Sequence, residues 1–322
     1  TTASNNTAVG DMALNANTDG TENVAVGANA LDANTTADAN TAIGYNAATA
    51  LVTGGYNVAL GHSALLANAT GVNNVAIGYQ TLNNNASPTA NVAIGYRACK
   101  NNNSNYGVFI GDRCASNGIV GGEKNVGVGH YSLFNLTTGA YNTAIGANAL
   151  DDNTTASHNT AVGNGSLSAN TTGTQNVAVG SLALNANTTA SNNTALGYNT
   201  LSANTTGTVN VAVGNHVLDG ATEANFNTGV GGYSLGANTT GGSNTAIGAY
   251  ALDANTTASN NTAVGHDALG LNTTGTQNVA VGNYSLDANT GGNYNTAMGY
   301  EALSAHTASY NAAFGYQASY SM

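Results

Sequence analysis

The sequence predicts an all-β protein, a parallel β-solenoid of nineteen coils of about 17 residues each. Three observations predict it: a glycine-ended phrase occurs nineteen times, the intervals between copies are nearly constant, and branched apolar residues return at the same places in each copy. Disordered Asn- and Thr-rich tracts do not need such regularity. Stacked repeats do, because each repeat buries its apolar side against its neighbours. We therefore expect residues 1–322 to form a single solenoid domain.

The repeated phrase reads Asn-[Thr/Val]-Ala-[Val/Ile]-Gly. Seventeen residues are too few for a pair of helices, and the frequent Asn, Gly and Thr would interrupt a long one. One coil of a solenoid suits this length. The intervals between the phrase glycines are 17 residues except for two of 16, before Gly111 and before Gly315, and one of 18, before Gly129. The glycines are Gly10, Gly27, Gly44, Gly61, Gly78, Gly95, Gly111, Gly129, Gly146, Gly163, Gly180, Gly197, Gly214, Gly231, Gly248, Gly265, Gly282, Gly299 and Gly315.

The three residues before each of these glycines are expected to form a strand. The first and third lie two apart and should point to one side, and the middle residue to the other. The third is apolar in all nineteen repeats, as in Val9, Ile43 and Phe314, so we expect the first and third to face the core. The middle residue, Ala in sixteen repeats, should then face outward, where a column of methyl groups would let a second chain approach closely.

The rest of the unit is expected to form a corner, a second strand and a return turn. The glycine, present in every repeat, suggests a positive φ or a lack of room for a Cβ. Leu follows four residues later in fifteen repeats and is expected on the second strand as another core anchor. The Asn that opens the phrase, replaced once by Gly107, should form a hydrogen-bonded ladder between coils. An Asn-Thr-Thr-Gly stretch then makes the return turn.

Composition argues against several classes of function. With a net charge of −11 and four basic residues, the chain lacks the cations that bind nucleic acid. No apolar run approaches the roughly 20 residues needed to cross a bilayer, so we expect no membrane insertion. The six histidines are scattered, and no nucleophile, base and orienting group can be assembled, so we expect no enzyme, cofactor or metal site. The acids that follow the anchor Leu are expected to be solvated; they are Asp32, Asp151, Asp219, Asp253 and Asp287.

Two surface features are expected. Tyr recurs one or two residues after the corner glycine, and such an exposed aromatic rank could stack on sugars or pack on a neighbour. The tyrosines directly after the glycine are Tyr45, Tyr79, Tyr96, Tyr198, Tyr300 and Tyr316, and those one residue further are Tyr131, Tyr233, Tyr250 and Tyr284. Asn-x-Ser/Thr triplets recur at the return turn, a surface position where a secreted protein would accept glycan. Their asparagines are Asn34, Asn68, Asn153, Asn170, Asn187, Asn204, Asn238, Asn255 and Asn272.

Residues 88–124 form an irregular collar in the repeat array. The collar contains the only Pro, both cysteines, all four basic residues and the altered spacing. Cys99 and Cys114 occupy similar places in consecutive coils, near bonding distance, and a disulfide is possible if the shorter interval shifts the register by one residue. The basic residues suggest a binding spot; they are Arg97, Lys100, Arg113 and Lys124.

The phrase Asn-Val-Ala-Ile-Gly at 74–78 and 91–95 resembles the head repeats of YadA-like trimeric autotransporter adhesins. The longer phrase Asn-Thr-Ala-Ile-Gly-x-x-Ala-Leu at 142–150 and 244–252 is similar to repeats in phage and environmental tail-fibre proteins. The resemblance covers essentially the whole chain, although the adhesin repeats are shorter than 17 residues. It implies a left-handed parallel roll, usually a homotrimer, displayed on a cell or virion surface.

These patterns predict a structural or adhesive shaft of an extracellular fibre. The partner is expected to be the chain itself, in a lateral trimer or an end-to-end polymer, and a host-surface glycan or receptor is a further candidate. An ice-binding solenoid is one alternative, because ranks of Thr on a flat sheet can order water, although Val interrupts those ranks here. A carbohydrate-binding β-helix protein is another.

Overall fold

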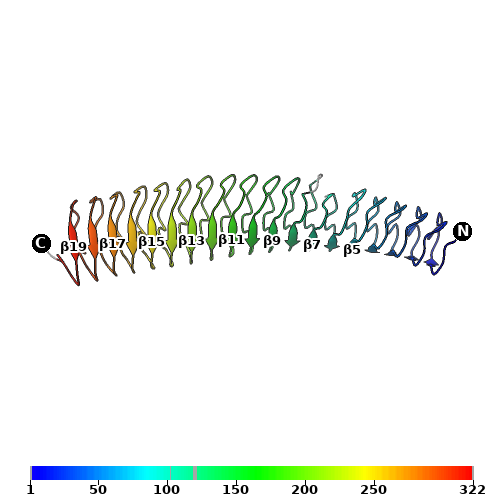
Figure 1. The fold of residues 1–322 in the computed structure, drawn as a ribbon, viewed down its shortest axis with the longest axis horizontal. Helices are drawn as coiled ribbons and strands as arrows, with labels where there is room; N and C mark the ends of the chain where they lie inside the picture. The colour runs from blue at the N-terminus through cyan, green and yellow to red at the C-terminus, as the bar shows by residue number, and fades with distance from the viewer. Residues whose placement is uncertain (1, 102, 119–121, 321–322) are drawn as a thin grey trace. The chain divides into compact units, whose positions relative to one another are not determined.

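The computed structural model describes residues 2–101, 103–118 and 122–320. These contain nineteen β-strands of three residues each, one before every corner glycine (Figure 1). The coils group into two compact units, Thr1–Asn159 with β1–β9 and Thr160–Met322 with β10–β19. The strands of the first unit are β1 (Thr7–Val9), β2 (Val24–Val26), β3 (Thr41–Ile43), β4 (Val58–Leu60), β5 (Val75–Ile77), β6 (Val92–Ile94), β7 (Val108–Ile110), β8 (Val126–Val128) and β9 (Thr143–Ile145). Those of the second are β10 (Thr160–Val162), β11 (Val177–Val179), β12 (Thr194–Leu196), β13 (Val211–Val213), β14 (Thr228–Val230), β15 (Thr245–Ile247), β16 (Thr262–Val264), β17 (Val279–Val281), β18 (Thr296–Met298) and β19 (Ala312–Phe314).

In each unit, every strand pairs in parallel with the equivalent strand of the next coil (Figure 1). Residue partners are equivalent repeat positions, as in Ala8 with Ala25 and Ala161 with Ala178. The register holds through the collar, where Phe109 pairs with Ala93 on one side and Gly127 on the other. The predicted parallel β-solenoid of 17-residue coils is therefore confirmed. No helix in the described part of the chain has the length and apolar character of a membrane span.

The predicted facing of the strands is wrong. The middle residue points into the coil, and Ala25 and Ala246 are fully buried. The first and third residues point outward, so that Val9, Ile43 and Ile247 are exposed. The coil interior is narrow and already holds a Leu and two Asn side chains, so a methyl group is what fits beneath the strand. The apolar third position therefore forms an outer face of the coil, and the Ala column is not available to a second chain.

The prediction of a second strand is also wrong, because the anchor Leu lies in a turn. Leu31 has a φ of 52° and Asn29, two residues earlier, a φ of 57°. These left-handed residues, rare outside glycine, let adjacent side chains turn inward, so Ala30 and Leu31 are both fully buried. The backbone N–H of Leu31 donates to the carbonyl of Ala47 in the next coil at 3.1 Å. The predicted burial of the anchor Leu is confirmed. Its backbone bonds to the next coil in place of the hydrogen bonds that a second strand would have made.

The corner glycine is required for both of the predicted reasons. Gly44 has a φ of 139°, a conformation that side chains strongly disfavour. A Cβ on it would lie 2.6 Å from the carbonyl oxygen of Gly61, the equivalent glycine one coil further. The coils therefore stack glycine on glycine at this corner.

The opening asparagines form the predicted ladder. The Nδ2 of Asn57 donates to the Oδ1 of Asn40 at 3.1 Å, and the Nδ2 of Asn74 donates to the Oδ1 of Asn57 at 2.9 Å. In the second unit Asn210 donates to Asn193 in the same way. The side chains are buried, and the same oxygens also accept backbone N–H groups of the next coil. The ladder therefore satisfies polar groups that the thin core could not otherwise bury.

Irregular residues in the middle strand position are compensated by neighbours. Phe109 is fully buried, and its ring occupies the space of a side chain at position 107, where Gly replaces Asn. A Cβ on Gly127 would lie 2.5 Å from the Sγ of Cys114. In the second unit, a Cβ on Gly229 would lie 2.6 Å from the Cγ1 of Val217. Each glycine thus offsets a larger side chain in the neighbouring part of the core.

Candidate functional site

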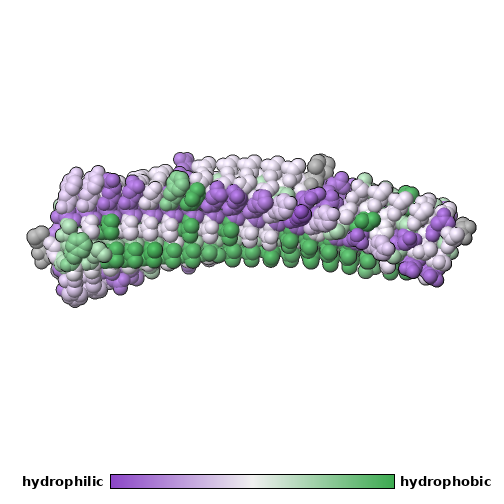
Figure 2. Space-filling view, viewed as in Figure 1, coloured by the Kyte–Doolittle hydropathy of each residue, from purple (hydrophilic) through white to green (hydrophobic). Residues whose placement is uncertain are grey.

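The first candidate site is the apolar strand face, which we define as the outward first and third residues of every strand. Neither position holds a charged residue in any of the nineteen strands. Its larger side chains are only partly covered: Ile145 is 41% exposed and Ile247 42%. In Figure 2 a hydrophobic stripe lies over the strands of each unit. A monomeric protein rarely leaves a contiguous apolar surface open to water, so this face has the character of an interaction surface.

The second candidate is the aromatic rank, the ring side chains one or two residues after the corner glycine. The six tyrosines directly after the glycine are all exposed, as expected. Four of them stack face to face in pairs, Tyr79 on Tyr96 at 5.3 Å and Tyr300 on Tyr316 at 5.5 Å. The rank therefore exists, and the spacing of the coils places its rings in contact.

Histidines also belong to the aromatic rank, which the sequence pattern had not led us to expect. His62 lies between Tyr45 and Tyr79, with ring centroids 5.1 and 5.2 Å away. His216 and His266 fill equivalent places in the second unit. The signal was available, since these histidines follow the corner glycine by the same one or two residues as the tyrosines.

In the second unit the rank is continuous over eight rings, but its geometry changes along the unit. His216, Tyr233 and Tyr250 are nearly parallel, with interplanar angles of 8° and 3°. From Tyr250 through His266 and Tyr284 to Tyr300 the rings instead meet edge to face, at 71°, 63° and 81°. Parallel stacking covers ring faces and edge-to-face packing leaves some of them open, so accessible ring faces lie around Tyr284, and also at Tyr198, which meets His216 at 74°.

The collar's cations pack on tyrosine rings of their own chain. The guanidinium of Arg97 lies 4.9 Å from the ring centre of Tyr96, and that of Arg113 lies 5.4 Å from the ring centre of Tyr131 and donates to its hydroxyl. The Nζ of Lys124 lies 5.2 Å from the ring centre of Tyr141. Lys100 is half-buried at a bend. Positions 102 and 119–121 of the collar lie outside the described residues. Three of the four cations thus extend the aromatic contacts of the first unit.

The acids that follow the anchor Leu are half-buried and not fully solvated, contrary to expectation. Burial, with the neighbouring Asp152, raises the pKa of Asp151 to about 6. Burial also raises the pKa of Asp253 and of Asp287, and nearby carboxylates add to both shifts. In the six successive coils of β13 to β18 this position reads Asp219, Gly236, Asp253, Gly270, Asp287 and Ser304, so carboxylates alternate with glycine in the first five. We call this series the acid column.

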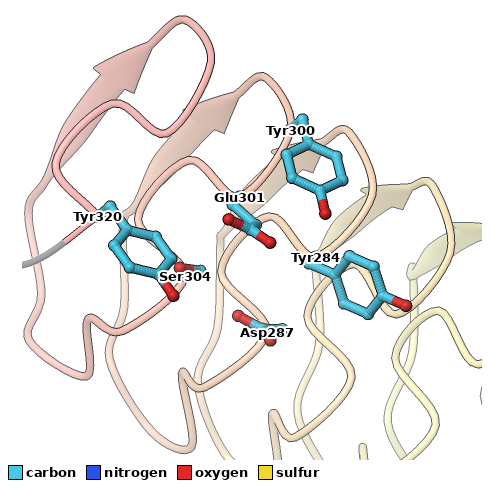
Figure 3. A pocket seen from close by; sticks show the side chains of 6 residues that line it. All are labelled: Tyr284, Asp287, Tyr300, Glu301, Ser304 and Tyr320. Atoms are coloured by element: carbon cyan, nitrogen blue, oxygen red, sulfur yellow. The ribbon is translucent and has the colours of Figure 1, made fainter.

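Two open hollows lie between the aromatic rank and the acid column. One, of about 180 Å³, is lined by Asp253, Asp267, Gly270, Leu271, Tyr284 and Asp287. The other, of about 290 Å³, is lined by Tyr284, Asp287, Tyr300, Glu301, Ser304 and Tyr320. Figure 3 shows the second, with the carboxylates of Asp287 and Glu301 between the ring of Tyr320 and the rings of Tyr284 and Tyr300. Tyr284 and Asp287 belong to both hollows, which together we call the aromatic–acid groove.

The predicted glycosylation asparagines differ from the expected surface placement, because their side chains point into the coil. All nine are fully buried. The Nδ2 of Asn170 donates to the carbonyl of Gly173 at 3.0 Å, and the Nδ2 of Asn187 donates to the Oδ1 of Asn170 at 2.9 Å. A glycan on such a nitrogen would require space that the coil interior does not have. In the second unit, these asparagines also bond to one another in adjacent coils and form a second internal ladder at the return turn.

The predicted disulfide is absent, and both cysteines are buried thiols. They do lie in adjacent coils, since the backbone N–H of Cys99 donates to the carbonyl of Cys114 at 2.8 Å. The Sγ of Cys114 lies 3.0 Å from the hydroxyl of Ser132, in the coil on its other side. Burial raises the pKa of Cys114 to about 12 and that of Cys99 well above the usual range. The expected register shift is unnecessary, because both repeat positions face the interior.

Among the described residues, no three His, Cys, Asp or Glu side chains are grouped so as to hold a metal ion. The ion pairs described there join histidine to aspartate, as in His216 with Asp219 at 2.7 Å and His266 with Asp267 at 2.9 Å. Comparison of the chain with models of protein families, with curated proteins and with solved structures gave no match.

Proposed function

We propose that the chain is a structural and adhesive shaft of a fibre displayed on a cell or virion surface, in which copies associate laterally through the apolar strand face. The observation that carries the proposal is the outward, uncharged face of first and third strand residues in both units. The interface expected from sequence was the Ala column, which is buried inside each coil. The proposal therefore moves the contact to the side chains that the structure leaves exposed, and it assigns no catalysis to the chain.

The energetics favour contact over many coils at once. Fully burying an Ile or Leu side chain contributes about 1.5–3 kcal/mol, and side chains such as Ile145 are about two-fifths exposed, so each coil has roughly 1 kcal/mol left to gain. Association opposes this with about 4–15 kcal/mol of lost translational and rotational freedom. A contact of one or two coils would not hold, whereas side-by-side alignment of a whole unit would.

The test places lysines on the apolar strand face. Ile43, Ile145 and Leu196 are changed together to Lys, and the control carries Asn46→Lys, Asn148→Lys and Asn199→Lys in the same three coils. The control positions follow the corner glycine by two residues, where the chain itself has Arg97 and Arg113. Light scattering coupled to size exclusion should give a multiple of the 31.7 kDa chain mass for the wild type and control, and the single chain mass for the face variant. A face variant as large as the control would refute lateral association through this surface.

Ice binding is a second candidate, favoured by the outward position of the strand threonines. Thr228, Thr245 and Thr262 occupy the first strand position in three consecutive paired coils. Because this position faces solvent, they form a short rank of hydroxyls and methyls on a flat sheet. Thermal hysteresis in a freezing assay, abolished by Thr245→Lys, would favour ice binding. Its absence at high protein concentration would leave the fibre proposal alone.

A further inference from the structure

The aromatic rank of the second unit offers open ring faces where its rings meet edge to face, between Tyr198 and His216 and from Tyr250 to Tyr300. Around Tyr284 the neighbouring rings of His266 and Tyr300 stand at 63° and 81° to it, with centroids 5.4 and 6.1 Å away. By contrast, parallel partners cover both faces of Tyr233, which lies between His216 and Tyr250. Both hollows of the aromatic–acid groove include Tyr284. A ligand that packs against an aromatic face therefore has access here.

Unneutralised carboxylates surround the same ring. All Lys and Arg residues of the chain lie between positions 97 and 124, so the second unit has none. Among the described residues, Asp219 and Asp267 pair with histidines, but Asp253 and Asp287 take part in no ion pair. The Oδ1 of Asp287 is buried and accepts no hydrogen bond from the described residues. The groove therefore favours a positively charged group near Asp287.

Glycines in the acid column keep the carboxylates apart and the groove open. Gly270 lies between Asp253 and Asp287 in the column and lines the smaller hollow with both of them. A Cβ on Gly270 would lie 3.4 Å from the Oδ1 of Asp267, which lines the same hollow. Two coils separate these aspartates, which is roughly 10 Å at the usual strand spacing. The groove thus offers negative charge at intervals along the stack, with ring faces beside it. A linear ligand with regularly spaced cations fits this arrangement better than a single compact ion.

We propose that the aromatic–acid groove binds an oligosaccharide of amino sugars whose amines are free and protonated. The apolar face of one sugar ring packs on the open face of Tyr284, and separate ammonium groups of the oligosaccharide lie beside Asp287 and Asp253. Ring hydroxyls of the sugar reach the hydroxyls of Ser304 and Tyr320, which line the same groove. This site does not depend on lateral association of chains, because its residues lie outside the apolar strand face.

Isothermal titration of the full chain with a glucosamine hexamer, at mildly acidic pH where its amines are protonated, tests the proposal. The fully acetylated hexamer has the same sugar backbone without charge and should bind at least about tenfold more weakly. Spermine has the charges without the sugar, so it should bind more weakly than the glucosamine hexamer and should not respond to Tyr284→Ser. No heat with the glucosamine hexamer, or equal affinity for the acetylated one, would overturn the proposal.

Variants locate the site. Asp287→Asn and Tyr284→Ser should each weaken binding of the glucosamine hexamer by about tenfold. The matched controls are Asp151→Asn, at the same repeat position in the first unit, and Tyr79→Ser, whose ring is stacked on Tyr96. These should bind as the wild type does. Equal losses in variants and controls would show nonspecific attraction to an acidic chain and would refute a site at the groove, and thermal melting of each variant verifies that it is folded.

Discussion

Val217 and Gly229 are predicted to be a compensating pair whose separate substitution is harmful and whose joint substitution is not. Val217 is fully buried three residues after its corner glycine, where most coils have Ala or Ser. Gly229 occupies the middle of β14, where most coils have Ala. Its missing Cβ would lie 2.6 Å from the Cγ1 of Val217, well inside normal contact distance.

The magnitudes follow from this geometry. Gly229→Ala overpacks the coil and should destabilise it by about 2 kcal/mol. Val217→Ala removes two buried methylene equivalents and leaves a small cavity, which should also destabilise by about 2 kcal/mol. In the double variant the new methyl group occupies the space that Val217 vacated, as in coils that have Ala at both positions. The double variant should lie within about 1 kcal/mol of the wild type, so the coupling is about 3 kcal/mol.

The assay is a double-mutant cycle. Urea denaturation gives the free energy of unfolding, and hydrogen exchange of the β13 and β14 amides gives the local opening free energy, which is needed because repeat arrays do not always unfold as one unit. Val217→Ala combined with Ala246→Gly, which lies in β15 two coils away from Val217, serves as the additive control. Additive effects in the Val217 and Gly229 cycle would refute the explanation of these glycines as volume compensation. A cycle on Cys114 and Gly127 repeats the test in the first unit.

Three further predictions concern buried polar groups. Asn57→Ala removes the ladder partner of Asn40 and Asn74 and should destabilise the chain by about 3 kcal/mol in urea unfolding, whereas the exposed Asn15→Ala should change stability by less than about 0.5 kcal/mol; equal effects would show that the ladder is unimportant. Asp151→Asn should stabilise the chain at neutral pH by about 1 kcal/mol, after allowance for solvent screening, because the pKa of this carboxyl is raised to about 6 by folding. That gain should shrink as the pH falls below 6 and disappear near 3.8, and a gain that persists in acid would contradict it. Cys99 and Cys114 should resist alkylation in the folded chain and react once it is unfolded, as mass spectrometry would show, because burial raises the pKa of both thiols; rapid labelling of the folded chain would contradict their placement.

The fold could be predicted from the sequence because the repeat is long, regular and rich in position-specific residues. The chemistry of glycine suggested a corner with positive φ, and the chemistry of the opening Asn suggested a hydrogen-bonded ladder. The structure contains both the corner and the ladder. Which side of each strand faces the core could not be predicted from the alternation of residues alone. The first and third residues are more apolar than the middle Ala, so hydrophobicity favours the wrong side, and only the width of the coil decides that Ala25 fits inside and Val26 does not.

The candidate sites were partly predictable for a similar reason. The tyrosines of the aromatic rank follow the corner glycine closely, which was sufficient to expect their exposure. The two left-handed residues of each turn, such as Asn29 and Leu31, were not expected, because they are neither glycine nor restricted to Asn. They place both Cys99 and Cys114 inside although the two differ by one repeat position. The sequon asparagines follow these turns directly, and the backbone N–H of Asn34 donates to the carbonyl of Leu31 at 3.1 Å.

The central claim, that the outward strand residues are the surface through which chains associate, is tested most directly by measuring mass in solution. Sedimentation equilibrium of the wild type should give a fixed multiple of 31.7 kDa. The variant with Ile43, Ile145 and Leu196 changed to Lys should give 31.7 kDa under the same conditions, with an unchanged β circular dichroism spectrum. A folded wild-type chain that sediments as a monomer at every concentration would contradict the claim.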